Sequence, residues 1–204
     1  MKTRKATIYT GKTFSVPQCI QRIDHRATHG WQLRYGGTKM FSDGPAGAAD
    51  SLRRATQELL ERIAKLPAPS LLQTTPNKTK TSDLPVGISG PIVRTRRGSK
   101  ARQCSFCVSL PQFGAKMKGT SVYIGAESTY NTQRYEIALA KAIKIRKRAE
   151  QIYKSDATRA KRAEGEAMKA KQAAREDART ARATRAAHAA RATPAKRATR
   201  AAAV

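Results

Sequence analysis

The stretch 91–153 constrains the fold of this chain most, because its apolar side chains change there from a spacing of two to a helical spacing. Residues 103–110 alternate apolar and polar side chains, which is typical of a strand with one buried face. Shorter runs at 92–97 and 121–124 predict two neighbouring strands. We therefore expect three short strands followed by one long helix.

The expected helix begins at Asn131 or Thr132, either of which can cap its first turn, and ends at about Tyr153. Its small and apolar face, which allows close packing on a sheet, consists of Ala138, Ala142, Ile145, Ala149 and Ile152. The rest of its surface is basic, with Lys141, Lys144, Arg146, Lys147 and Arg148. The uncovered face of the sheet is expected to carry Arg94, Arg96, Gln103 and Ser105.

Residues 9–66 repeat this order of elements with a different sequence. The three strands and the helix predicted there occupy residues 19–24, 30–35, 38–41 and about 50–65. Trp31 alternates with Gln32 and Arg34 and shares its spacing with Leu33 and Tyr35. The pattern therefore favours a core position for Trp31 over a stacking contact with a base.

These elements predict an α+β fold with two tandem units, each a three-stranded antiparallel sheet plus one helix. The expected divisions are a basic leader at 1–8, a first unit at 9–66, a linker at 67–86, a second unit at 87–153 and a tail at 154–204. The linker is rich in Pro, Thr, Ser and Lys, a composition typical of flexible connections.

The tail consists almost entirely of Ala, Arg, Lys and Thr, and no acidic residue follows Asp177. Alanine and arginine favour helix, but the tail has no apolar face to pack, so we expect it to be disordered or loosely helical. Its end, 192–200, resembles in composition the tails of linker-histone-like nucleoid proteins. Such a segment neutralises phosphates and releases their counterions.

The charge of the chain indicates its class of partner. A net charge of +27 over 204 residues implies a polyanion, with nucleic acid ahead of an acidic membrane surface. No apolar run approaches the roughly 20 residues that cross a bilayer, and no apolar segment follows the basic N-terminus as a secretory signal requires. Three cysteines cannot all pair and suggest a reducing compartment. We expect a cytoplasmic, nucleoid-associated protein.

The order of short motifs resembles the Apetala-two/ethylene-response-factor DNA-binding domain, in two tandem copies of the bacterial or phage type. In the second unit the resemblance is carried by residues 87–90, 93–96, 106–109, 122–125 and 136–143. In the first unit it is carried by residues 20–23 and 30–34 and by the helix that follows.

The resemblance implies a sheet that lies in the major groove of double-stranded DNA, with arginines that contact bases and phosphates. In the second unit the implied DNA-binding residues are Arg94, Arg96, Gln103, Ser105 and Tyr123. In the first unit they are Arg22, Gln32, Arg34 and Lys39. The implied function is a transcription regulator or a nucleoid-associated architectural factor.

Catalytic and metal-binding patterns are weak in this sequence. Cys104 and Cys107 have the spacing of half a zinc site, but no second pair follows, and an offset of three in a strand directs them to opposite faces. Cys19, His25 and His29 match no common zinc pattern. No Ser/His/Asp set, phosphate loop or paired carboxylates stand out, so we expect no enzyme, no metal and no cofactor.

Two other functions stay open. The protein could bind RNA, since a basic tail does not distinguish one polyanion from another. It could also be the DNA-binding accessory of a phage or mobile-element recombinase or endonuclease whose catalytic part lies elsewhere. No membrane or small-molecule partner is expected, and the oligomeric state stays open.

Overall fold

The chain folds into antiparallel sheets and helices, so the prediction of an α+β fold is confirmed. The computed structural model describes residues 1–95, 98 and 101–201, with side chains as far as His188. Two compact units are present: Met1–Lys65 with Arg162–Val204, here the first unit, and Leu66–Lys161, the second unit. None of the described helices has a stretch that is both long and apolar enough to cross a membrane.

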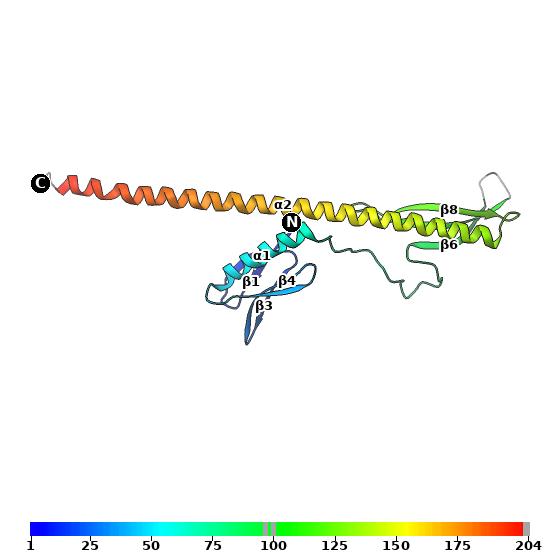
Figure 1. Cartoon of the computed structure of the whole chain (residues 1–204), viewed down its shortest axis with the longest axis horizontal. Helices are drawn as coiled ribbons and strands as arrows, with labels where there is room; N and C mark the ends of the chain where they lie inside the picture. Colours follow the sequence, from blue (N-terminus) through cyan, green and yellow to red (C-terminus); the bar gives the residue numbers. More distant parts are fainter. Residues whose placement is uncertain (96–97, 99–100, 202–204) are drawn as a thin grey trace. The chain divides into compact units, whose positions relative to one another are not determined.

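In the first unit, residues Met1–Lys65 form a two-stranded hairpin, a three-stranded sheet and a helix (Figure 1). The hairpin pairs β1 (Thr3–Thr7) with β2 (Thr13–Pro17). The sheet has the order β3-β4-β5 and is followed by α1; the bounds are β3 Ile20–His25, β4 Thr28–Arg34, β5 Thr38–Ser42 and α1 Gly47–Lys65. These four elements agree with the predicted ones to within a few residues.

The hairpin differs from the prediction of a basic leader at residues 1–8, since Thr3–Thr7 form its first strand. Its strands carry few apolar side chains, and tertiary contacts hold them in place. Val16 is fully buried, Phe14 lies edge-on to Trp31 with ring centroids 5.9 Å apart, and the Arg4 guanidinium donates to the Ile20 carbonyl at 3.1 Å. None of these contacts has a local pattern in the sequence that would reveal it.

The core of the first unit forms between the sheet and α1. Ile20, Trp31 and Leu33 from the sheet and Leu59 and Ile63 from the helix are all at most 2% exposed. The Trp31 indole nitrogen donates to the Ala48 carbonyl at 2.8 Å, which ties the middle strand to the first turn of α1. The prediction that Trp31 is a core residue is therefore confirmed.

The second unit contains a sheet of order β6-β7-β8 and the beginning of the long helix α2 (Figure 1). The bounds are β6 Ile88–Thr95, β7 Arg102–Leu110, β8 Lys118–Ala126 and α2 Thr132–Ala201. Phe106, Val108 and Val122 pack against Ala138 and Ala142 of α2, so the small face of the helix lies on the sheet as predicted.

The start of α2 agrees with the prediction, but its end does not. The Asn131 side chain accepts a hydrogen bond from the Arg134 backbone nitrogen at 2.8 Å and caps the helix. We expected the helix to end at about Tyr153, yet α2 continues to Ala201. Alanine, arginine and lysine have high helix propensity, and this propensity continues past the last residue that packs on the sheet. Ile152, placed by the pattern on the packed face, is 55% exposed.

Arg146 is buried, although the sequence pattern placed it on the basic surface of the helix. It is 6% exposed, and its guanidinium donates to Glu150 at 2.6 Å and to the Ser109 carbonyl. Gly87, just before β6, lies against this guanidinium: a Cβ built on Gly87 would come within 2.6 Å of it. Gly87 also has a φ of +80°, which disfavours any residue with a side chain.

Gly87→Ala is therefore expected to destabilise the second unit by about 2–4 kcal/mol. Adopting this φ costs an L-residue roughly 1–2 kcal/mol, and the displaced Arg146 adds the loss of buried hydrogen bonds. Hydrogen exchange of the β7 backbone amides measures this loss in the free energy of unfolding. Gly114→Ala is the matched control, since Gly114 also has a positive φ, +72°, with open space at its Cβ. Equal losses in the two variants would show that the contact with Arg146 contributes nothing.

Candidate nucleic-acid interface

One face of the β6–β8 sheet is left open by α2. Cross-strand partners in an antiparallel sheet share a face. The register pairs Arg94 with Gln103, and it pairs Ser105 with both Ile92 and Tyr123. The strand residues on this face, called the free sheet face below, are Ser89, Ile92, Arg94, Gln103, Ser105, Cys107, Ser109, Gly119, Ser121, Tyr123 and Ala126. The structure thus brings four of the five predicted residues of this unit onto one surface; Arg96 lies outside the described residues.

The free sheet face is polar, and its charge is positive. Its positive charge comes from Arg94; the strands β6, β7 and β8 contain no acidic residue, and their other two cations, Arg102 and Lys118, belong to the opposite face, which also carries Phe106 and Leu110. Arg94 is exposed, and no carboxylate among the described residues forms an ion pair with it. Tyr123 is 53% exposed, while Gln103 and Ser105 are half-buried. This face therefore combines an unneutralised guanidinium with amide, hydroxyl and phenol groups.

The sheet of the first unit offers a smaller surface of this kind. Gln32 and Arg34 alternate with the buried Trp31 and Leu33 and so lie on the face away from the core. The Arg34 Nε donates to the Gln32 side-chain oxygen at 2.6 Å. These two predicted residues are therefore adjacent and accessible, and the contact between them orients the guanidinium.

The prediction that Arg22 and Lys39 share one DNA-binding surface with Gln32 and Arg34 is wrong. Arg22 and Lys39 lie on the other face of that sheet. The register pairs Arg22 with Trp31 and Lys39 with Leu33, which places both on the core side. The Arg22 side chain is 6% exposed, and its guanidinium lies 5.0 Å from the centroid of the Trp31 ring. Lys39 donates to Glu58 of α1 at 2.7 Å.

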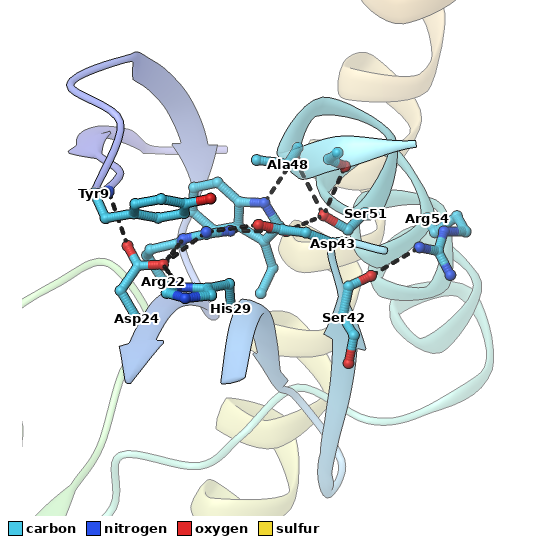
Figure 2. A network of polar contacts seen from close by, with 11 residues as sticks. Tyr9, Arg22, Asp24, His29, Ser42, Asp43, Ala48, Ser51 and Arg54 are labelled. Carbon is cyan, nitrogen blue, oxygen red and sulfur yellow. Dashed lines mark hydrogen bonds and ion pairs between the residues drawn. The ribbon is translucent and has the colours of Figure 1, made fainter. Parts of the chain in front are cut away.

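Arg22 is the centre of a polar cluster that holds the first unit together (Figure 2). It forms two hydrogen bonds to Asp43, at 2.6 and 2.9 Å, and one to Asp24 at 2.9 Å. Asp43 also accepts a bond from Ser51 in α1 at 2.7 Å. Asp24 accepts from the backbone nitrogen of Tyr9 in the hairpin at 3.2 Å. The guanidinium thus joins β3 to the start of α1 and, through Asp24, to the hairpin.

The cluster shifts the pKa values of its members. Hydrogen bonds from Arg22, followed by weaker effects of its charge, hold the pKa values of Asp24 and Asp43 below their ordinary range despite their partial burial. Burial lowers the pKa of Arg22, but the hydrogen bonds and charges of Asp43 and Asp24 outweigh it, and the pKa is raised. All three groups are therefore charged at neutral pH, and the charge of Arg22 is compensated within the protein.

The first unit is expected to lose stability as the pH falls below about 4, the ordinary carboxyl pKa. A depressed folded-state pKa contributes stability above the unfolded value, and this contribution disappears as the pH falls through the folded value. Urea unfolding between pH 6 and pH 2, followed by fluorescence of the single tryptophan, Trp31, measures it. Asp43→Asn should flatten the pH dependence, and Asp156→Asn in α2 should leave it unchanged. An undiminished slope in Asp43→Asn would contradict this explanation.

The cysteines and histidines form no metal site in the described part of the chain. No three His, Cys, Asp or Glu side chains gather there in a way that could hold an ion. Cys104 pairs with Val93 and Gly125, whereas Cys107 pairs with Ser89 and Ser121. The two sulfurs therefore belong to opposite faces of the sheet, as their spacing predicted.

Relatives offer no independent guide to this surface. Comparisons with protein-family models, with curated proteins and with solved structures found no match to the chain. The chemistry of the free sheet face, and of α2 beyond it, is therefore the basis on which function is inferred.

Proposed function

We propose that this protein binds double-stranded DNA without catalysing a reaction, as a transcription regulator or a nucleoid-associated architectural factor in the cytoplasm. The observation that carries the proposal is the free sheet face. Among the described residues it has no carboxylate and presents an arginine without an ion pair beside a glutamine, and its opposite face is occupied by α2. In this proposal the two sheet-plus-helix parts act as tandem Apetala-two-like units.

The size and side chains of this face suit a major groove. Three strands spaced by ~4.8 Å span about 10 Å between their outer backbones, and the major groove is about 12 Å wide. Arginine donates two hydrogen bonds to guanine, and glutamine exchanges two with adenine. Arg94 and Gln103 are direct cross-strand neighbours, so together they can contact adjacent base pairs. The hydroxyls of Ser105 and Tyr123 are suited to phosphate oxygens.

The end of α2 supplies charge without sequence information. Residues 178–204 contain seven Lys or Arg and no Asp or Glu. Arg179, Arg182 and Arg185 are exposed in α2. A segment of this composition binds phosphates and raises the affinity for every duplex alike.

RNA binding is the second candidate, because Tyr123 is a half-exposed aromatic side chain on an open sheet. Unstacked bases of single-stranded RNA stack on such rings. Competition between duplex DNA, structured RNA and single-stranded RNA at equal phosphate concentration distinguishes the candidates. We expect duplex DNA to compete best; preferential competition by either RNA would replace the DNA proposal.

Arg34→Ala is expected to reduce affinity for DNA by up to about tenfold, the effect of one lost phosphate or base contact, with little change in stability. Lys39→Ala removes the same charge from the same sheet, but its ammonium is paired with Glu58 on the core side. Lys39→Ala should therefore reduce the affinity for DNA less than Arg34→Ala does. Fluorescence anisotropy with a labelled duplex measures both. A larger effect of Lys39→Ala would contradict the assignment of the faces.

A further inference from the structure

The outward side of α2 in the second unit carries a row of cations, opposite the side that packs on the sheet. The outer stripe, as we call it, consists of Lys141, Lys144, Lys147 and Arg148, all of them exposed. At 100° per residue these positions point about 90° or more away from the direction of Ala142, which is fully buried against the sheet. The stripe is therefore a separate surface from the free sheet face.

No carboxylate neutralises the outer stripe. In the described part of the chain none of its four cations forms an ion pair, and the nearby Glu150 is bonded to the buried Arg146. The helix α1 is different: its Arg53 and Arg54 pair with Asp50, and its Arg62 pairs with Glu58. A solvated helix surface commonly interleaves both signs of charge, so an unpaired cationic row indicates an anionic partner.

The stripe fits a phosphate backbone better than a lipid bilayer. A helix that lies in a membrane interface needs a broad apolar face. The large apolar side chains exposed on this part of α2 are Ile137 and Ile152, one beyond each end of the stripe. Four cations over two turns of helix, about 11 Å, match instead the regular charges along one strand of DNA.

We propose that the outer stripe binds the phosphate backbone of a second DNA duplex, so that the second unit bridges two duplexes. This rests on the proposed function, in which the first duplex lies on the free sheet face. The two surfaces face away from each other across the thickness of a sheet and a helix. The helix alone is about 10 Å across with its side chains. One straight duplex therefore cannot occupy both surfaces.

A capture assay with the full chain tests the proposal. A biotinylated duplex on beads, incubated with the protein, should retain a second, fluorescent duplex that has no biotin. Changing all four stripe residues to glutamine, which keeps high helix propensity, should reduce capture of the second duplex by at least about tenfold. Affinity for a single duplex should change by less than about threefold, because the sheet and the end of α2 are intact.

The matched control changes four other cations of α2, Arg179, Arg182, Arg185 and Arg191, to glutamine. It removes the same charge from the same helix, and it should weaken single-duplex binding and capture in parallel. Circular dichroism and thermal unfolding establish that both variants fold as the wild type does.

The outcomes separate this proposal from the proposed function. If the wild type binds a duplex but captures no second one, or if the stripe variant captures as well as the wild type, bridging by the stripe is overturned and DNA binding stands. Parallel loss of single-duplex affinity in the stripe variant would also overturn it, because the stripe would then belong to the first site. Failure of the wild type to bind any duplex would instead overturn the proposed function. Loss of binding to vesicles that contain phosphatidylserine, with capture unchanged, would assign the stripe to lipid.

Discussion

Replacing Arg94 and Gln103 together by alanine is expected to lower the affinity for a selected DNA site by about 10²- to 10⁴-fold. Each bidentate contact to a base contributes about 1–3 kcal/mol of discrimination, and 1.4 kcal/mol corresponds to a factor of ten. Affinity for a scrambled duplex should fall by less than about tenfold, because Arg94 contributes only its charge there. Selection from a random oligonucleotide pool, followed by titration of both duplexes, provides the measurement.

The first unit contains a control pair with the same residue types. Arg53 and Gln57 are exposed on α1, away from either open sheet surface, and Arg53 is already paired with Asp50 at 2.6 Å. Arg53→Ala with Gln57→Ala should leave both affinities nearly unchanged. If the Arg94 and Gln103 variant loses equal affinity on the selected and the scrambled duplex, the free sheet face binds phosphates only. The protein would then be a packaging factor without a recognised site.

Removing the positive charge of residues 178–204 should weaken binding to all sequences alike, and this is the second large effect we expect. Each neutralised phosphate contributes about 0.9 to the slope of log affinity against log salt, so changing the seven Lys and Arg residues to glutamine should lower the slope by up to about 6. At low salt the affinity should fall by a factor on the order of 10³ or more. The ratio between selected and scrambled duplexes should stay constant.

A second variant of the same segment controls for helix content and length. It changes the four threonines, Thr180, Thr184, Thr193 and Thr199, to alanine and leaves every cation in place. Its salt slope should equal that of the wild type. If the glutamine variant has the same slope of log affinity against log salt as the wild type, the end of α2 does not contact phosphates.

The sheets and the starts of the helices were predictable because their patterns are local. Alternation around Phe106 and Val108 specifies which side of β7 is buried, and Ala138 and Ala142 specify the side of α2 that covers it. Arg94, Gln103 and Ser105 follow from the alternation of β6 and β7, whereas Tyr123 was implied by the family resemblance. The cap at Asn131 is likewise a local signal.

The pairing of β3 with β4 was not predictable in the same way. β4 alternates, but the two isoleucines of β3, Ile20 and Ile23, are three residues apart and so indicate opposite faces. The register between the strands then decides that Arg22 lies opposite Trp31, and a slip of one residue would exchange the faces. The acidic partners of Arg22 come from β3 itself and from Asp43, which follows β5. A basic residue in a strand therefore looks the same in sequence whether it faces DNA or a carboxylate.

Burial of Arg146 and formation of the β1–β2 hairpin depend on contacts between distant segments. Arg146 fits the basic pattern of α2, yet it fills the space beside Gly87 and donates to the Ser109 carbonyl. The hairpin depends on Val16 and on the bond from Tyr9 to Asp24. Of these features only Gly87 could be noticed in the sequence, as a glycine before a strand. Its positive φ and its contact with Arg146 are visible only in the structure.

The most direct test of the central claim is a photocrosslink from the free sheet face to DNA. The photoreactive residue p-benzoylphenylalanine replaces Ser121, which is exposed and pairs with Cys107 on that face. Thr10, exposed in the turn of the β1–β2 hairpin, serves as the control position. We expect irradiation with a bound duplex to crosslink the protein at position 121 and not at position 10. Retained affinity with no crosslink at 121, or equal yields at the two positions, would contradict the assignment of the free sheet face as the DNA-binding surface.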